Sequence, residues 1–291
     1  MSTNEPKLKS KSGSIAAYST LVYVVVIFFS ILAILPFWFM FMSATWPTSV
    51  LTRVIKLYPN PNLFKQLPEN WTKLTERATF SFPRGFYNSF VISISATVLT
   101  VYFSALTAYA LSVYNFKGRK VLFAVIVGVM MVPTAVNITG FYRLMNAMNL
   151  IGTKWPLILP AIAAPSTVFF IKQYLDTSLS KEIIEASRID GAGEFYTFNR
   201  ICLPIMTPAL ATQAIFSFLG SWNNFFAPSI LLSRPEDKTL PLMVAQLYGD
   251  RFVDYGAIYV GLSASILPII IVYAFMQRYI ISGVAAGGVK E

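Results

Sequence analysis

The chain of 291 residues is 55% hydrophobic and only 12% charged, whereas an average soluble domain carries about 25% charged residues. This deficit of charge excludes an ordinary soluble enzyme. The 23 Lys and Arg residues outnumber the 13 Asp and Glu residues, but they stand at the edges of apolar stretches. They form no basic stripe with interleaved aromatic residues, which argues against nucleic acid binding.

Six intervals of the chain contain no Asp, Glu, Lys or Arg. A charge at the bilayer centre costs at least about 2.5 kcal/mol, and each interval can hold the roughly 17–25 residues of a transmembrane helix. The intervals are 12–52, 85–116, 121–142, 155–171, 201–233 and 255–277. The sequence therefore predicts an all-α membrane protein with six transmembrane helices.

In chain order, the predicted helices cover residues 18–42, 87–112, 121–141, 157–174, 206–232 and 256–280. The first is a permanent helix, because its apolar run exceeds the roughly 7–15 residues of a signal-peptide core. The second is rich in Ser, Thr and Ala, which predicts close packing against other helices.

The segments outside the helices complete the predicted organisation, with an N-terminal tail at 1–17, a membrane domain at 18–281 and a C-terminal tail at 282–291. Residues 1–14 are Lys- and Ser-rich and are predicted to be disordered. The proline-rich stretch 43–85 is predicted to be an ordered extramembrane loop.

Two features remain neutral on function or orientation. The lone Cys202 cannot form an internal disulfide, and a chain with no histidine is a poor metal binder, so Cys202 is interpreted as a packing residue. With the N-terminus inside, the Lys and Arg count is twelve inside against eleven outside. That count decides nothing, although the basic cluster at 117–120 favours an inside N-terminus.

The connection between the fourth and fifth predicted helices, residues 176–204, differs from an ordinary loop. Ser180 is a predicted helix N-cap, and Glu182 in the first turn suits the helix dipole. Gly191 and Gly193 then punctuate the chain, since glycine enters positive-φ turns freely.

A second short helix is predicted at 194–200, with Phe195, Phe198 and Ile201 on one face. The product is a helical elbow outside the membrane, charged on one side and apolar on the other. From these residues alone, the elbow serves equally well as a docking surface or as an interfacial support of the bundle.

The elbow resembles the signature loop of permease subunits of binding-protein-dependent ABC importers. That signature reads Glu-Ala-Ala, three residues, Gly, nine residues, Ile-x-Leu-Pro. Here Ser187 replaces the second alanine, a small-for-small exchange expected to cost nothing. The matching residues are Glu185, Ala186, Ser187, Gly191, Ile201, Leu203 and Pro204, with Asp190 before the glycine.

Further stretches resemble the carbohydrate branch of that family, which includes the smaller maltose permease subunit, and the likeness covers residues 18–290. These stretches are Asn88-Ser89, 108–111, 189–192, Trp222-Asn223 and 277–290.

The resemblance implies a subunit that forms half of a sugar-translocating pore, most simply for an oligosaccharide, in the bacterial cytoplasmic membrane. It implies that 176–204 is a cytoplasmic coupling loop docked on an ATPase, so both termini lie in the cytoplasm. The implied partners are a second homologous permease subunit, a cytoplasmic ATPase dimer and an extracytoplasmic solute-binding protein received by the outer loops. The chain lacks a Gly-x4-Gly-Lys-Ser/Thr phosphate loop, so ATP and Mg would be bound by the ATPase and not by this chain, which is not an enzyme.

A stand-alone secondary transporter or channel for a neutral polar solute is the alternative. Proton-coupled carriers usually keep an ionisable residue in the membrane, and none of the six intervals has one. An intramembrane enzyme is a third class, and it lacks the residues for a catalytic site.

The predicted solute path is lined by an aromatic plane and amides that suit a hydroxyl-rich solute. The alternative is that these amides bond neighbouring helices, with the second permease subunit making most solute contacts. The residues are Trp222, Asn223, Asn224 and Asn137.

Overall fold

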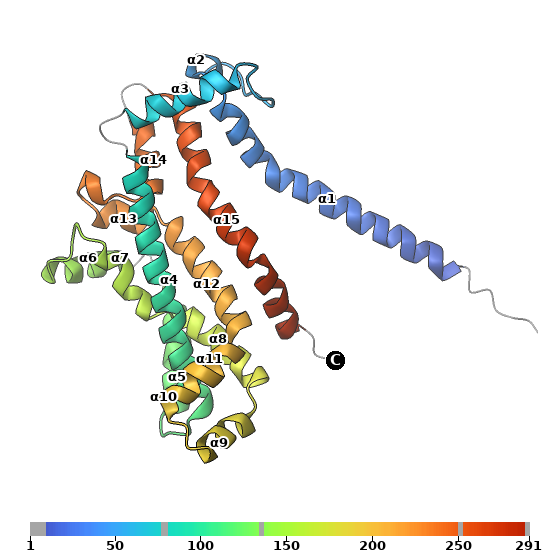
Figure 1. The fold of residues 1–291 in the computed structure, drawn as a ribbon, viewed down its shortest axis with the longest axis vertical. Helices are drawn as coiled ribbons and strands as arrows, with labels where there is room; N and C mark the ends of the chain where they lie inside the picture. The colour runs from blue at the N-terminus through green and yellow to red at the C-terminus, as the bar shows by residue number, and fades with distance from the viewer. Residues whose placement is uncertain (1–9, 77–80, 134–136, 250–252, 289–291) are drawn as a thin grey trace, which may run out of the picture. The chain divides into compact units, whose positions relative to one another are not determined.

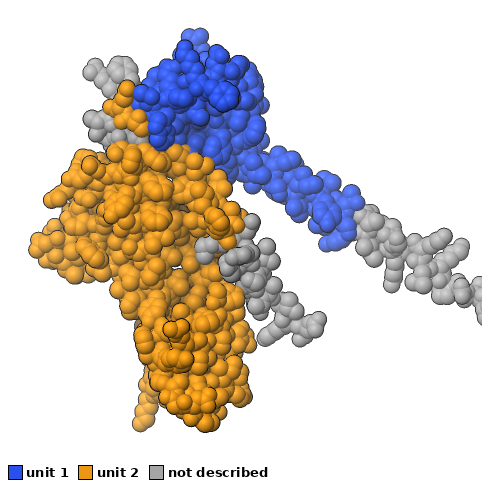
Figure 2. All heavy atoms as spheres, in the orientation of Figure 1, with its two compact units in different colours: residues 1–74, 254–263 blue, residues 75–253, 264–291 orange. Residues whose placement is uncertain are grey.

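The computed structural model describes residues 10–76, 81–133, 137–249 and 253–288, and every regular element within these ranges is a helix (Figure 1). The all-α prediction is confirmed. The chain divides into two compact units, one formed by residues 1–74 and 254–263 and the other by residues 75–253 and 264–291 (Figure 2). The sequence did not indicate this division. The boundary falls inside one continuous helix, α15, Tyr255–Gly288, and no break in the sequence marks it.

The first unit is built on α1, Ser10–Ala44, followed by the short α2, Thr48–Leu51, and by α3, Leu63–Thr75. The apolar part of α1, Tyr18–Ala44, buries only 6% of its most apolar window. A helix this apolar with its sides uncovered is suited to lipid contact.

Asn70 on α3 holds the first unit together. Its fully buried side chain donates from Nδ2 to the carbonyl oxygens of Ala44, at 2.9 Å, and Trp46, at 3.0 Å. It thereby satisfies the last carbonyl of α1, which the helix itself leaves unpaired, and a carbonyl two residues beyond the helix end. A Cβ on Gly256 would lie 2.8 Å from the Asn70 side chain, so Gly256 and Asn70 are in close contact. The part of the predicted loop around Asn70 is therefore ordered.

In the second unit, α4, Phe82–Val113, packs along α12, Thr207–Trp222, and α8, Pro165–Ser178 (Figure 1). Its most apolar window is 39% buried, and Ala105 and Ala108 are fully buried. Small side chains let the helix backbones approach. The predicted packing of this helix against other helices is confirmed.

Shorter helices complete the second unit. They are α5 Arg119–Met130, α6 Ile138–Ala147, α7 Trp155–Ile158, η2 Leu159–Ile162, α9 Lys181–Ile189, α10 Glu194–Tyr196, the π-helix η3 Thr197–Cys202, α11 Leu203–Ile205, α13 Phe226–Leu231, η4 Pro235–Asp237, α14 Leu240–Gln246 and η5 Leu247–Gly249.

The six-helix count is not confirmed. Four described helical segments are long and apolar enough to span a membrane, and a fifth qualifies only if two segments bent by 80° at Met206 count as one. The predicted helix at 121–141 divides into α5 and α6 around Pro133, and the predicted helix at 206–232 breaks after Trp222, before Pro228. Proline explains both breaks, since it lacks the N–H of the helix ladder and its ring clashes with the carbonyl four residues earlier.

Helical structure extends into both predicted tails. Helix α1 begins at Ser10, inside the stretch predicted to be disordered, and α15 continues to Gly288. Extending an existing helix adds one hydrogen bond for each residue fixed, and neither extension contains proline. The remaining tail residues, 1–9 and 289–291, lie outside the described residues.

Candidate functional site

The elbow turns at Gly191. Helix α9 ends in a glycine-terminated turn in which the Gly191 N–H donates to the Arg188 carbonyl and the Ala192 N–H donates to the Ser187 carbonyl, each at 3.0 Å. This pairing satisfies the last carbonyls of the helix and requires a left-handed residue. Gly191 has φ 78°, as the sequence predicted, whereas Gly193 has φ −68°, which any residue adopts.

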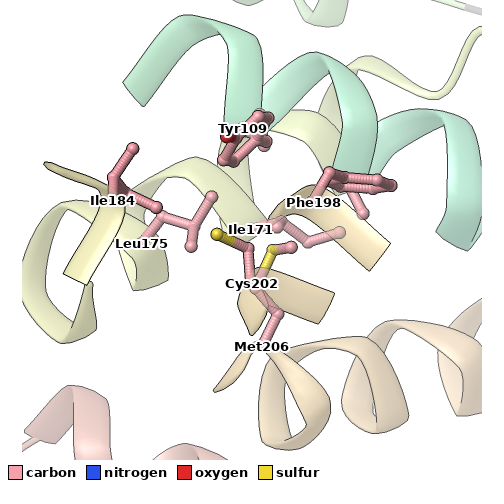
Figure 3. Close-up of a cluster of buried hydrophobic side chains, with 9 residues drawn as sticks. Tyr109, Ile171, Leu175, Ile184, Phe198, Cys202 and Met206 are labelled. Atoms are coloured by element: carbon pink, nitrogen blue, oxygen red, sulfur yellow. The ribbon is translucent and has the colours of Figure 1, made fainter. Parts of the chain in front are cut away.

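The inner face of the elbow is a buried apolar cluster that seats both of its arms on α4 and α8 (Figure 3). Because the cluster draws on four helices and on the turn at Met206, the elbow cannot shift without disturbing the bundle. Its members are Ala105, Ala108, Tyr109, Ile171, Leu175, Ile184, Phe198, Cys202 and Met206. Cys202 is fully buried among them, which confirms its interpretation as a packing residue.

The predicted apolar face at three-residue spacing is wrong. Phe195 is 72% exposed, and the buried row is instead Phe198, Cys202 and Met206, spaced four residues apart. The cause is the π-helix at Thr197–Cys202. Its i→i+5 hydrogen bonds place more residues in each turn than an α-helix does.

Ser187 joins the two arms of the elbow. Its hydroxyl lies 2.8 Å from the Ile184 carbonyl oxygen, to which it donates, and 3.2 Å from the hydroxyl of Thr197 on the second arm. Both side chains are buried. An alanine at position 187 would make neither contact. The serine that replaces the second alanine of the motif, an exchange expected to have no effect, therefore provides a link between the two arms.

Glu194 gathers three donors where the second arm begins. Its carboxylate accepts hydrogen bonds from the Tyr114 hydroxyl at 2.6 Å, from Arg188 Nε at 2.8 Å and from the Tyr109 hydroxyl at 3.4 Å. Burial, together with the hydrogen bond to Glu194, raises the pKa of Tyr114, so its phenol stays a donor. Sequence reasoning missed this cluster because its tyrosines precede Glu194 by 80 or more residues.

The outer face of the elbow is exposed. It carries the motif residues Glu185, Ala186 and Asp190 next to large apolar side chains that no described residue covers: Ile189 is 85% exposed, Phe195 72% and Tyr196 59%. Of the other motif residues, Pro204 is exposed, and Ile201 and Leu203 are half-buried. Apolar groups beside carboxylates, on a seat that is itself rigid, suit a protein–protein contact.

Ser180 stands at the N-cap of α9, as predicted, but its hydroxyl contacts the Glu182 carboxylate and makes no backbone cap hydrogen bond. This contact lowers the pKa of Glu182. Glu182 therefore remains an anion in the first turn of α9, where the helix dipole favours negative charge.

The residues of the predicted solute path differ in their surroundings. Trp222 is 1% exposed, its indole N–H donates to the Ser265 carbonyl at 3.1 Å, and its ring packs against Phe86 and Phe218. Asn223, by contrast, is exposed at the end of α12.

The other two amides of the predicted path mark the starts of helices. The Asn224 side chain accepts the Ala227 N–H at 3.2 Å and so caps the start of α13. Asn137 is exposed at the start of α6, a helix that contacts α13.

The opposite end of α4 holds a second set of contacts. The buried Asn88 donates from Nδ2 to the carbonyls of Glu236, at 2.8 Å, and Lys238, at 3.0 Å, and the Ser89 hydroxyl accepts the Leu240 N–H at 2.9 Å. From Asn88 to Tyr109, α4 rises about 32 Å, close to the roughly 30 Å of a bilayer core.

Comparison with known proteins agrees with this geometry. Residues 100–285 match the family described as binding-protein-dependent transport system inner membrane component. The chain belongs to this family. It is therefore a multi-pass membrane protein of the transport-permease type and not an enzyme, and the match gives no support to a stand-alone carrier.

Individual relatives extend the match to nearly the whole chain. The arabinooligosaccharides transport system permease protein AraQ of Bacillus subtilis is 37% identical over 90% of this chain and 92% of its own length. The diacetylchitobiose uptake system permease protein NgcG of Streptomyces coelicolor is 28% identical over 96% and 91%. A crystal structure of a bacterial ABC transporter involved in import of the acidic polysaccharide alginate shares the fold, with a TM-score of 0.78 and 21% identity over 96% of this chain and 100% of that one.

Proposed function

We propose that this permease subunit carries an oligosaccharide into the bacterial cytoplasm as half of the pore of an ABC importer. The support for the substrate class comes from the names of the relatives, whose cargoes are arabinooligosaccharides and diacetylchitobiose. A second homologous permease would form the other half of the pore. An extracytoplasmic binding protein would deliver the sugar.

The elbow carries the mechanistic part of the proposal. Its inner face is seated on α4 and α8, and its outer face presents Glu185 and Ile189 to the surroundings. A cytoplasmic ATPase dimer, which would bind ATP and Mg, docks on this outer face. Closure of that dimer would move the elbow, and the packed cluster would pass the motion to the spans because close-packed side chains transmit displacement.

Two substitutions on the outer face test the docking. Glu185→Lys reverses a charge at the interface and Ile189→Asp places a charge in its apolar part, and each should weaken co-purification of the ATPase subunit and abolish sugar-stimulated ATP hydrolysis. Lys181→Ala, an exposed change on the same helix, is the control. If the ATPase subunit co-purifies and responds to sugar normally in both variants, the elbow is a support and not a docking surface.

The orientation follows from this docking, with both termini and the elbow in the cytoplasm. The contacts at the two ends of α4, about 32 Å apart, favour opposite sides for the elbow and for the segment around Glu236. In a Cys202→Ala background, a cysteine at Ser180 should react with an impermeant thiol reagent only when the inner face is opened. A cysteine at Glu236 should react from outside, and the reverse labelling would reject the orientation.

The solute path is proposed to pass the break between α12 and α13, with Asn223 as its main hydrogen-bonding group and Asn224, Asn137 and Trp222 framing it. The exposure of Asn223 beside the packed Trp222 supports this division of roles. Asn223→Ala should weaken sugar uptake without changing the amount of assembled complex. Normal uptake in this variant would leave the amide without a transport role.

A further inference from the structure

The chain folds back along α1 after leaving the membrane helix. Residues 53–58, here called the return segment, are tied beside the helix by two indole N–H groups. Trp38 Nε1 donates to the Leu57 carbonyl at 2.7 Å and Trp46 Nε1 donates to the Tyr58 carbonyl at 2.9 Å. The return segment is therefore held at the level of Trp38, below the end of α1.

The length of α1 places this level relative to a bilayer. The apolar part of the helix has 27 residues, which rise about 40 Å, whereas the hydrocarbon core is about 30 Å thick. The exposed stretch from Tyr18 to Trp38 alone rises about 30 Å and fills that core, so the residues after Trp38 extend into the headgroup region. Trp38 stands six residues before Ala44, about 9 Å below the helix end, so the return segment reaches the boundary between headgroups and acyl chains.

Protein contacts begin along α1 at the same level. Side chains from Tyr18 to Trp38 are exposed along the helix, whereas Met40, Ser43 and Ala44 are buried within the first unit. The return segment therefore lies where the lipid-facing part of the helix gives way to its packed end.

The exposed side chains of the return segment are those of a membrane interface. Val54, Ile55 and Leu57 are each more than half exposed, and Ile55 is 72% exposed. Leaving such apolar side chains in water is unfavourable, and contact with acyl chains removes that cost. No described residue covers them.

Lysine and aromatic rings complete the pattern. Lys56 Nζ lies 5.1 Å from the centroid of the Trp46 ring and 5.5 Å from that of Tyr58, and these two rings meet edge to face at 5.8 Å. Trp, Tyr and Lys gather where bilayer meets water, because each combines an apolar body with a polar end. Arg53 supplies a second cation on the same segment.

We propose that the return segment is a lipid-binding surface that lies in the interface of the leaflet at the Ala44 end of α1. Val54, Ile55 and Leu57 contact the upper acyl chains. Lys56 and Arg53 bind phospholipid phosphates. The surface anchors the end of α1 and the loop that follows it, and it is independent of the transported solute.

Depth measurement with a spin label tests the surface directly. Ile55→Cys in a Cys202→Ala background is labelled in the assembled transporter, reconstituted in phosphatidylcholine–phosphatidylglycerol vesicles. Oxygen concentrates in the bilayer and a nickel chelate stays in water. The ratio of oxygen to nickel relaxation should be several-fold higher at position 55 than at Glu69→Cys, an exposed position on α3 that serves as the matched control.

Two outcomes would overturn the proposal. One is a label at position 55 that is as open to the nickel chelate as the label at position 69. The other is a label at position 55 that becomes protected from both reagents only when the solute-binding protein is added, since the surface would then be a protein docking site. A third variant, Trp38→Phe, removes the indole N–H donor but keeps an aromatic side chain, and it should lower the oxygen ratio at position 55. An unchanged ratio would show that the tie to α1 does not set the depth.

Discussion

The elbow and the break after Trp222 are both interruptions of helix in the same unit, yet they are held differently. The elbow turns through one left-handed glycine and places both arms on a buried cluster (Figure 3). At the break, a deeply packed tryptophan is followed at once by an exposed amide at Asn223, and the Asn224 side chain accepts the Ala227 N–H at the start of the next helix.

The difference separates two ways of building a functional interruption. The elbow is rigid on its inner face and open on its outer face, which suits the transmission of force from a docked partner. The break is packed at Trp222 and exposed at Asn223, which is the arrangement that the proposed solute path requires. Substitutions that remove the contacts holding each interruption are the sharpest tests of this difference.

The largest expected effect lies at the packed side of the break. Trp222→Ala removes a 1% exposed indole with its hydrogen bond to Ser265, and large-to-small changes of this kind cost about 3–5 kcal/mol. The midpoint of thermal unfolding of the purified transporter should fall by several degrees. Trp155→Ala, at a tryptophan 52% exposed, is the matched control and should change it little. Equal losses in both would mean that Trp222 is not a packing anchor.

Glu194→Ala tests whether the elbow depends on hydrogen bonds between its second arm and distant parts of the bundle. The change removes the acceptor shared by Tyr114 and Arg188. Hydrogen bonds to a charged group contribute about 1.5–3 kcal/mol, and the low end applies because the Glu194 side chain is 47% exposed. Sugar-stimulated ATP hydrolysis should fall several-fold while the ATPase subunit still co-purifies.

The control for this variant is Glu182→Ala, which removes a carboxylate of the same elbow whose side-chain partner, Ser180, is local to α9. Its sugar stimulation should stay near normal. Tyr114→Phe should reproduce part of the Glu194→Ala loss and add little to it in the double variant. Fully additive losses would show that the two side chains act separately.

The sequence alone predicted the features that depend on the local chain and missed those that depend on distant contacts. The turn at Gly191 was predictable because a left-handed helix end depends on the local chain, and the motif spacing preserves it. The helix count was not, because Pro133 and Pro228 interrupt charge-free intervals that hydropathy alone treats as continuous. The role of Ser187 was also missed, since its partner Thr197 becomes a neighbour only once the elbow has folded.

The environment of the predicted path residues shows a second limit. Trp222, Asn223 and Asn224 are consecutive, and nothing in their order distinguishes the buried ring from the exposed amide. The distinction comes from Phe86 and Ser265, which pack against Trp222 from distant parts of the chain. Burial that depends on such partners is invisible to local patterns.

Gly191→Val tests whether the turn itself matters. No heavy atom lies within 4 Å of a Cβ built there, so the cost is the left-handed backbone alone, about 1–2 kcal/mol. The chain should reach the membrane at near-normal level but lose sugar-stimulated ATP hydrolysis, because α9 is misdirected. Gly193→Val has equal space and an extended backbone at φ −68°, and it should remain coupled. Loss of coupling in both, or in neither, would contradict the assignment of the turn to Gly191.

The smallest expected effect concerns the link between the arms. Ser187→Ala leaves the hydroxyl of the fully buried Thr197 without the contact at 3.2 Å, and an unsatisfied buried hydroxyl costs about 1–3 kcal/mol, whereas replacing both partners by apolar groups is nearly neutral. Ser187→Ala should therefore lower the unfolding midpoint slightly and reduce coupling by less than Glu194→Ala does. The double variant Ser187→Ala with Thr197→Val should recover most of that loss, because no orphaned hydroxyl remains. If the loss in the double variant equals or exceeds the sum of the losses in the two single variants, the two hydroxyls do not act as a pair, and the arms of the elbow are held by the apolar cluster alone.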